Sequence, residues 1–213
     1  MQYLTFLTIA GLLVAPPALA HEGPHAAATA TAAPAPAPQL QAALRGLWHG
    51  HVVHTRDYAL AVHAGDATRA QAAADAVVAN AKQLSEAIAG FYGPAAGKQM
   101  LTLLAGHWGA VQAMTLAEHR RDRAAFNQAV ATLTDNAGQI ATFLAGANPH
   151  LTADAVRGLL LAHGAHHAAQ IGQVMRGDTQ GEAATWRAMQ AHMDAISDAL
   201  ATALARQFPK KAA

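Results

Sequence analysis

Three histidines, His51, His107 and His163, stand 56 residues apart at one position of a recurring pattern. The three local sequences are Leu47-Trp-His-Gly-His51, Leu103-Leu-Ala-Gly-His107 and Leu159-Leu-Leu-Ala-His163. Imidazole is the commonest metal ligand in proteins. Three imidazoles from three segments, with one position left vacant, are typical of an open zinc or copper site. The spacing therefore indicates a transition-metal site.

The same spacing recurs in three further columns of residues. These columns are His63, His119 and Met175; Asp66, Asp122 and Asp178; and Asn80, Asn136 and His192. Several columns that share one period are typical of internal repeats. We therefore interpret the folded part of the chain as three copies of a unit of about 56 residues.

Each repeat has the pattern of two helices joined by a short turn. Apolar residues recur at helical spacing from Leu40 to Val62, and the later helices are predicted over residues 67–90, 95–120, 123–147, 152–176 and 180–207. The aspartate column falls where a side chain can cap the free N–H groups of the next helix. Short turns between long helices favour antiparallel neighbours. The predicted fold is therefore all-α, a single-domain bundle of six helices in three hairpins over residues 39–209.

Counting residues from the turns sets the asparagine column level with the histidine column. His51 lies 15 residues before Asp66 and Asn80 lies 14 after it, so both are roughly 21–22 Å from the turn. The same count holds in the other repeats, and the predicted metal ligands are His51, His107, His163 and His192. Asn80 and Asn136 would complete the ligand set or hold the ligand imidazoles in place. The alternative is a hydrogen-bonded His–Asn network that binds no metal.

Further histidines lie next to this layer along their helices. His54 and His166 follow His51 and His163 by three residues, and His167 comes one residue later. These three could enlarge the site, while exposed or interfacial side chains are the alternative. Because imidazole must be neutral to bind a metal ion, we expect metal affinity to fall as the pH drops through about 6.5.

A weaker site is suggested near the turns. His63, His119 and Met175 share one column there and could form a soft site for cuprous ion. The alternative is that the two histidines, in the last turn of their helices, complement the helix dipole.

The first 20 residues have the pattern of a secretory signal peptide. A short apolar run is followed by Ala18-Leu-Ala20, the small-x-small pattern at which signal peptidase cleaves. Cleavage would expose His21, whose α-amine and ring could chelate cupric ion with His25 nearby. Residues 21–38 are rich in Ala and Pro and are predicted to form a disordered linker. We expect the protein to be periplasmic or secreted.

The composition of the chain excludes several classes of function and of metal site. The formal net charge of +1 gives no basic surface for nucleic acid, and the leading apolar run is too short to span a membrane. The chain has no cysteine, which excludes disulfides and thiolate metal sites.

The favoured function is an exported protein that stores, buffers or passes on a metal ion, with copper favoured and zinc next. The alternatives are an enzyme whose His-ligated metal activates water or oxygen and a metal-free interaction module. Ala-rich outer faces would also allow a homodimer.

A set of motifs is spread along the chain: Leu47-Trp-x-x-His51-x-x-x-Thr55-Arg56, Asn80, Phe91-Tyr-Gly93, Leu103-Leu-x-x-His107, Asn136, Asn148-Pro149, His163, Asp198 and Gln207-Phe-Pro209. In these motifs the chain resembles a family of uncharacterised bacterial all-helical proteins with no established activity. The resemblance covers residues 40–209 and implies that the histidine column is a family feature. The chain departs from the family pattern in three ways: His54 stands where a tryptophan is usual, His166 and His167 are extra, and it has an export signal.

Overall fold

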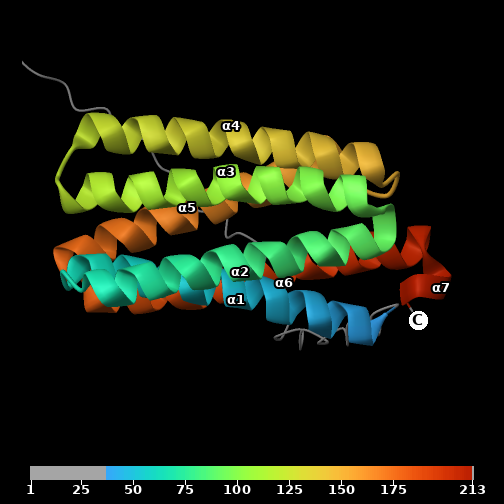
Figure 1. Cartoon of the computed structure of the whole chain (residues 1–213), viewed down its shortest axis with the longest axis horizontal. Coiled ribbons are helices and arrows are strands. Elements are labelled where there is room, and N and C mark those ends of the chain that lie inside the picture. Colours follow the sequence, from blue (N-terminus) through green and yellow to red (C-terminus); the bar gives the residue numbers. More distant parts are fainter. Residues whose placement is uncertain (1–36, 213) are drawn as a thin grey trace, which may run out of the picture. The chain divides into compact units, whose positions relative to one another are not determined.

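A computed structural model describes residues 37–212 of the chain (Figure 1). Nearly all of these residues are helical, and no strand occurs among them. The helices are α1 (Pro38–His63), α2 (Ala67–Tyr92), α3 (Pro94–His119), α4 (Arg123–Ala147), α5 (Ala153–Arg176), α6 (Thr179–Gln207) and α7 (Pro209–Ala212). None of the helices in this part of the chain is long and apolar enough to cross a membrane. The predicted all-α bundle is confirmed.

The six predicted helices are all present, and a seventh follows them. α7 is a single turn after α6, too short for a helical pattern to show in the sequence. At the other end, α1 begins at Pro38, and Ala37 is buried against the last residues of α6 and α7. The end of the predicted linker 21–38 therefore belongs to the bundle. The rest of that linker and the predicted signal peptide, residues 1–20, lie outside the described residues.

The three turn aspartates cap the second helix of each pair, as predicted. Each carboxylate accepts a hydrogen bond from the backbone N–H three residues later, at 2.9–3.0 Å. The residue before each aspartate has a left-handed backbone; these residues are Gly65 (φ 69°), Arg121 (φ 57°) and Gly177 (φ 70°). Glycine adopts this conformation freely, whereas the Cβ of an arginine is strained in it. The middle turn therefore has the same geometry as the other two at a cost in backbone energy.

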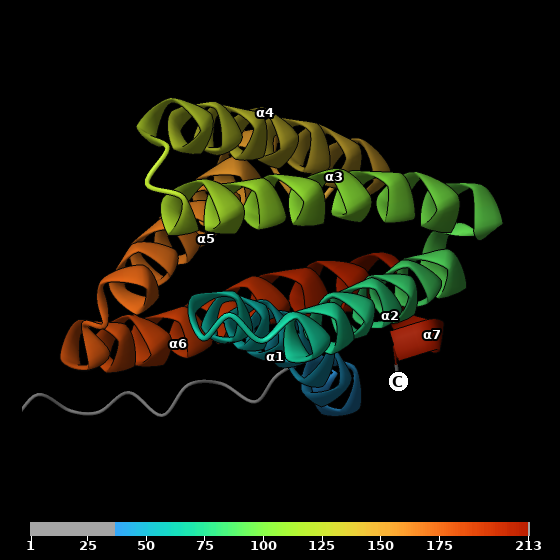
Figure 2. The same cartoon turned by 60° about the vertical axis from the view of Figure 1, so that its left-hand side comes forward.

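The first helix of each pair lies on the inside of the bundle. α1, α3 and α5 contact one another, and each of α2, α4 and α6 packs between two of them, which closes a ring in chain order. Figure 1 shows these long helices side by side, and Figure 2 shows α5, in orange, crossing obliquely from α4 to α6. This arrangement brings the three helices that carry the histidine column together at the centre. That the chain consists of three repeats stays a prediction.

Two apolar clusters fill the bundle on either side of the histidine column. On α1, Trp48 belongs to the first cluster and Tyr58 to the second, with His51 between them. The same order holds along the other inner helices, with Leu104, His107 and Val111 on α3 and Leu160, His163 and Ile171 on α5. A polar layer therefore divides an otherwise apolar core, and a buried polar layer must satisfy its hydrogen bonds or bind a ligand.

A hydrogen-bonded network joins three chain segments at one end of the bundle. The Tyr92 hydroxyl donates to Gln207 Oε1 at 2.8 Å and accepts from Asn148 Nδ2 at 2.9 Å. Gln207 Nε2 donates to the carbonyl oxygen of Ala147 at 3.0 Å. These bonds hold the end of α2, the α4–α5 turn and the end of α6 together.

A charged cluster joins α1, α5 and α6 beyond the histidine layer. Arg56 donates to both carboxylate oxygens of Glu182, at 2.7 and 2.9 Å, and Gln170 donates to the same carboxylate at 2.8 Å. The guanidinium also lies over the ring of Trp186, 5.0 Å from its centroid. Hydrogen bonds to charged groups are stronger than neutral ones, so this cluster helps to fix α6 against the two inner helices.

Candidate metal centre

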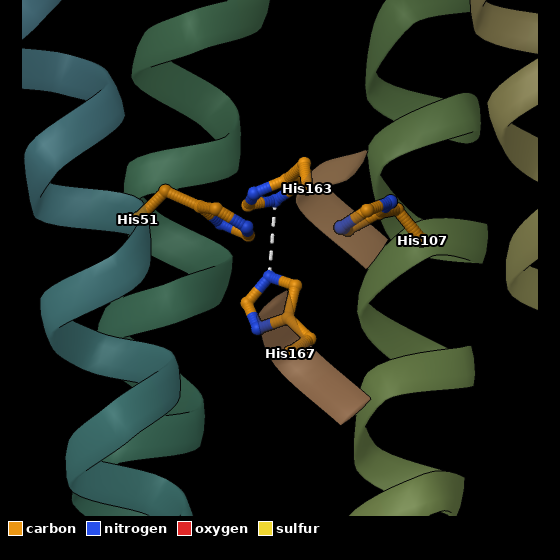
Figure 3. Close-up of side chains that lie close together, drawn as sticks. All are labelled: His51, His107, His163 and His167. Atoms are coloured by element: carbon orange, nitrogen blue, oxygen red, sulfur yellow. Dashed lines mark hydrogen bonds between the residues drawn. The ribbon is translucent and has the colours of Figure 1, made fainter. Parts of the chain in front are cut away.

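Four histidine side chains converge at the centre of the bundle (Figure 3). They are His51 from α1, His107 from α3, and His163 and His167 from α5. One ring nitrogen of each lies within 4.8 Å of those of the others, and the residues are only 1–4% exposed. The structure thus brings together the three histidines of the predicted column and adds His167.

The spacing of the four rings is close to that of a tetrahedral ligand set. Five of the six distances between ring centroids lie between 5.4 and 5.9 Å. The sixth, between His163 and His167, is 4.3 Å, because a hydrogen bond of 3.0 Å joins their Nε2 atoms. Four nitrogens within 4.8 Å of one another fit a sphere of about 2.9 Å radius, whereas a metal–nitrogen bond is about 2.0–2.1 Å. Each nitrogen would have to move inward by at most about 0.9 Å.

Burial keeps these four imidazole rings neutral. Burial, together with the nearby rings of His107 and His54, lowers the pKa of His51 to about 3. It lowers the pKa of His107 to about 4. Burial, followed by the charge of neighbouring histidines, also lowers the pKa of His163 and of His167 well below the usual value. The expectation that protons compete with metal from pH 6.5 downward is therefore wrong for the folded protein, because these rings stay neutral well below that pH.

Several ring nitrogens of the cluster lack hydrogen-bond partners. Among residues 37–212, no group bonds to His51 Nε2, to either ring nitrogen of His107 or to His163 Nδ1. A buried polar atom without a partner costs about 1–3 kcal/mol. Burying several such nitrogens without a metal ion therefore costs several times this free energy. An ion that bound these nitrogens as ligands would recover part of it.

Two asparagines support the histidine layer from the even helices. Asn80 Nδ2 donates to the carbonyl oxygen of Leu47 at 2.9 Å, and Asn136 Nδ2 donates to that of Leu103 at 3.0 Å. Both side-chain oxygens are buried, and no donor within the described part of the chain bonds to them. Asn136 partly offsets the lowered pKa of His107, although no hydrogen bond of ordinary geometry joins its Oδ1 to the ring. A ring N–H of His107 that donated to this oxygen would give the imidazole the support that metal-binding histidines usually receive.

His192 occupies the third position of the asparagine column but does not join the cluster. Its Nε2 lies 2.8 Å from the carbonyl oxygen of Leu159, a contact equivalent to those of Asn80 and Asn136. The position of His192 along the bundle axis is as predicted. However, α6 lies outside the three inner helices, so the ring contacts the backbone of α5. The structure therefore places His167, and not His192, among the ligand candidates.

The spacing of His167 was the sequence signal for its place in the cluster. It follows His163 by four residues, which puts both side chains on one face of α5. The residues at the same position of the other two predicted repeats, Thr55 and Val111, are 3% and 1% exposed. An exposed or interfacial position for His167 is therefore wrong. His54 and His166 remain partly exposed and outside the cluster.

The predicted weaker site lies on the surface at the turn end of the bundle. His63, His119 and Met175 all line one pocket there. The charged residues of the same pocket are Glu118, Arg121, Arg123 and Arg176. Three arginines against one glutamate oppose the binding of a cation. The other predicted weak ligands, His21 and His25, lie outside the described residues.

Comparison of the chain with models of protein families, with curated proteins and with solved structures found no match. The resemblance inferred from the sequence motifs therefore stays a prediction. The functional argument rests on the geometry and chemistry of the four-histidine cluster.

Proposed function

We propose that the protein binds one transition-metal ion inside the bundle through His51, His107, His163 and His167. The observation that carries this proposal is that four buried, neutral imidazoles present nitrogens within 4.8 Å of one another. Neutral imidazole is the form that binds metal ions. A tetrahedral ion would use one nitrogen of each ring and would leave the second nitrogen to donate to a neighbouring acceptor such as Asn136 Oδ1.

The charge of the site favours copper, as the cuprous ion, over zinc. All four candidate ligands are neutral, and no carboxylate of the described residues belongs to the cluster. The cost of burying an ion in an apolar interior rises with the square of its charge, so a divalent ion would cost roughly four times as much as a monovalent one. Imidazole suits both copper and zinc. Copper is therefore the favoured metal and zinc the next.

The ligand set supports storage, buffering or transfer of the ion. Four protein ligands complete a tetrahedral shell, as in structural metal sites, whereas catalytic sites keep one position for water or substrate. This argues against the enzyme that activates water or oxygen. The signal-peptide pattern of residues 1–20 supports export to the periplasm or outside the cell.

The proposal is tested by titrating metal-free protein, purified without a histidine tag, with Zn(II) by calorimetry and with Cu(I) against a coloured chelator. Replacing any one of the four cluster histidines by Ala should weaken binding at least tenfold, or by about 1.4 kcal/mol. The matched controls are His63→Ala and His150→Ala. Both remove exposed histidines away from the cluster, so both should bind like the wild type.

Circular dichroism and thermal unfolding of each variant separate loss of a ligand from loss of the fold. If His107→Ala does not fold, His107→Asn keeps a polar side chain at that position and serves instead. Failure of the wild type to bind either ion more tightly than free imidazole does would refute the proposal. So would wild-type affinity in the four variants, and the metal-free interaction module would then be the better explanation.

A further inference from the structure

A second pair of histidines lies across the seam between α5 and α6. The rings of His166 on α5 and His192 on α6 have centroids 5.4 Å apart and are tilted by 55°. Both residues are partly exposed, unlike the four buried histidines. The contact of His192 Nε2 with the carbonyl oxygen of Leu159 fixes this ring and leaves its Nδ1 to bind another partner.

The separation of these rings suits a shared metal ion. Two imidazoles bound to one ion through bonds of about 2.0–2.1 Å, at a near-tetrahedral angle, place their ring centroids about 5 Å apart. The remaining positions on such an ion would belong to water. A site with two protein ligands binds an ion weakly enough to release it, whereas the buried cluster supplies four.

The pair borders the two ligand candidates of α5. His166 is the chain neighbour of His167, and His192 contacts the backbone one turn before His163. The electrostatic effect of the pair reaches the cluster, because His192 contributes to the lowered pKa of His163 and His166 to that of His167. Imidazole nitrogens are therefore present both at the surface between α5 and α6 and in the buried cluster beneath it.

The α5–α6 hairpin alone has a histidine at both of these positions. The equivalent pairs in the other hairpins are His54 with Asn80 and Ala110 with Asn136. Each asparagine makes the same bond to a backbone carbonyl that His192 makes. Asparagine is thus sufficient for the bond to the backbone carbonyl, and His192 has in addition a second ring nitrogen.

We propose that His166 and His192 form a solvent-facing site that first binds the transition-metal ion and passes it to the buried four-histidine centre. This inference rests on the proposed function. The buried residues are only 1–4% exposed, so a hydrated ion cannot reach them directly. A surface pair of imidazoles raises the local concentration of the ion beside the seam and replaces part of its water shell. The ion then needs only a local separation of α5 and α6 to reach His163 and His167.

The test measures the rate of metal uptake separately from the final affinity. Co(II) is the probe, because tetrahedral nitrogen ligation in the buried centre gives strong visible absorption that the hydrated ion lacks. Stopped-flow mixing with metal-free protein gives the uptake rate, and equilibrium titration gives the affinity. The variants are His166→Ala and His192→Asn, which copy the residues that the middle hairpin has at these positions. His192→Asn keeps the bond to the carbonyl of Leu159 and removes the imidazole.

Each variant is expected to take up Co(II) about tenfold more slowly than the wild type. The affinity should stay within about twofold of the wild-type value. His150→Ala, which removes an exposed histidine remote from the seam, should match the wild type in both measurements. His54→Ala tests uptake from the exposed side of α1 and should also leave the rate unchanged.

Each other outcome has a separate meaning. If the wild type binds no Co(II), Zn(II) or Cu(I), the proposed function fails, and this inference fails with it. Uptake by His166→Ala and His192→Asn at the wild-type rate refutes the loading site alone. A large loss of affinity in His192→Asn also refutes it, because His192 would then belong to the final ligand set. Slow uptake in His54→Ala alone would move the route to α1.

Discussion

Acidification is expected to destabilise the metal-free protein steeply through its buried histidines. In the unfolded chain a histidine has a pKa near 6.5, whereas the pKa values of His51 and His107 in the fold are about 3 and about 4. Below pH 6.5 the unfolded state binds protons that the folded state does not, so stability falls with pH. The full stability of the fold is therefore present above about pH 6.5. It is lost progressively as the pH falls from there toward the pKa values of the folded state.

The size of this effect follows from the separation of the pKa values. At pH 5 each of His51 and His107 lowers the free energy of unfolding by about 2 kcal/mol, or about 4 kcal/mol together. The pKa values of His163 and His167 are lowered in the same direction and add to the loss. A domain is typically stable by about 5–15 kcal/mol, so the loss is a large part of the total.

The carboxylates act in a separate window of pH. An arginine partner lowers the pKa of Glu182 and of Asp198, so these groups are still ionised near pH 5. Their contribution to stability is present above their unfolded-state pKa and is lost as the pH falls through the lowered folded-state value. A loss between pH 6.5 and 5 therefore reports on the histidines.

Urea unfolding of the metal-free protein, followed by circular dichroism from pH 8 to pH 5 with a chelator present, measures this loss. His107→Asn should remove about 2 kcal/mol of the pH dependence, because asparagine does not titrate. His150→Ala, at an exposed position, should keep the wild-type dependence. A change of less than about 1 kcal/mol between pH 8 and pH 5 in the wild type would refute the reasoning, since the rings would then be hydrated or protonated in the fold.

Other substitutions test the middle turn and the polar contacts near the site. Arg121→Gly should raise the free energy of unfolding by about 0.5–1 kcal/mol in urea, because relief of the left-handed strain exceeds the entropy cost of glycine; a decrease would show that the turn is not strained. Asn136→Ala removes the bond to the carbonyl of Leu103 and should lower stability by about 1–2 kcal/mol. Its metal affinity in calorimetry should fall about tenfold, and an unchanged affinity would mean that Asn136 does not support a ligand. Glu182→Ala leaves Arg56 without its carboxylate and should cost about 1–3 kcal/mol of unfolding free energy, whereas a loss below about 0.5 kcal/mol would show that solvent replaces the pair.

The sequence by itself determined the positions of the histidines and asparagines of the site along the bundle axis. A helix rises by a constant 1.5 Å per residue, and the capping aspartates mark where each hairpin turns. Counting from Asp66 was therefore enough to set Asn80 level with His51. The hydrogen bond from Asn80 to the carbonyl of Leu47, one turn before His51, agrees with that count. The caps, the turns and the six long helices follow from the same local signals.

Only the tertiary structure decided which side chains face the centre. Height along a helix does not fix the rotation of that helix about its axis, and rotation depends on which neighbours a helix packs against. α5 packs against both α1 and α3, so His163 and His167 point into the cluster together. α6 packs outside these inner helices, so His192 reaches only the backbone of α5. Packing also decides the chemistry: burial among apolar side chains makes the four rings neutral and leaves several of their nitrogens without partners, and burial arises only when distant segments come together.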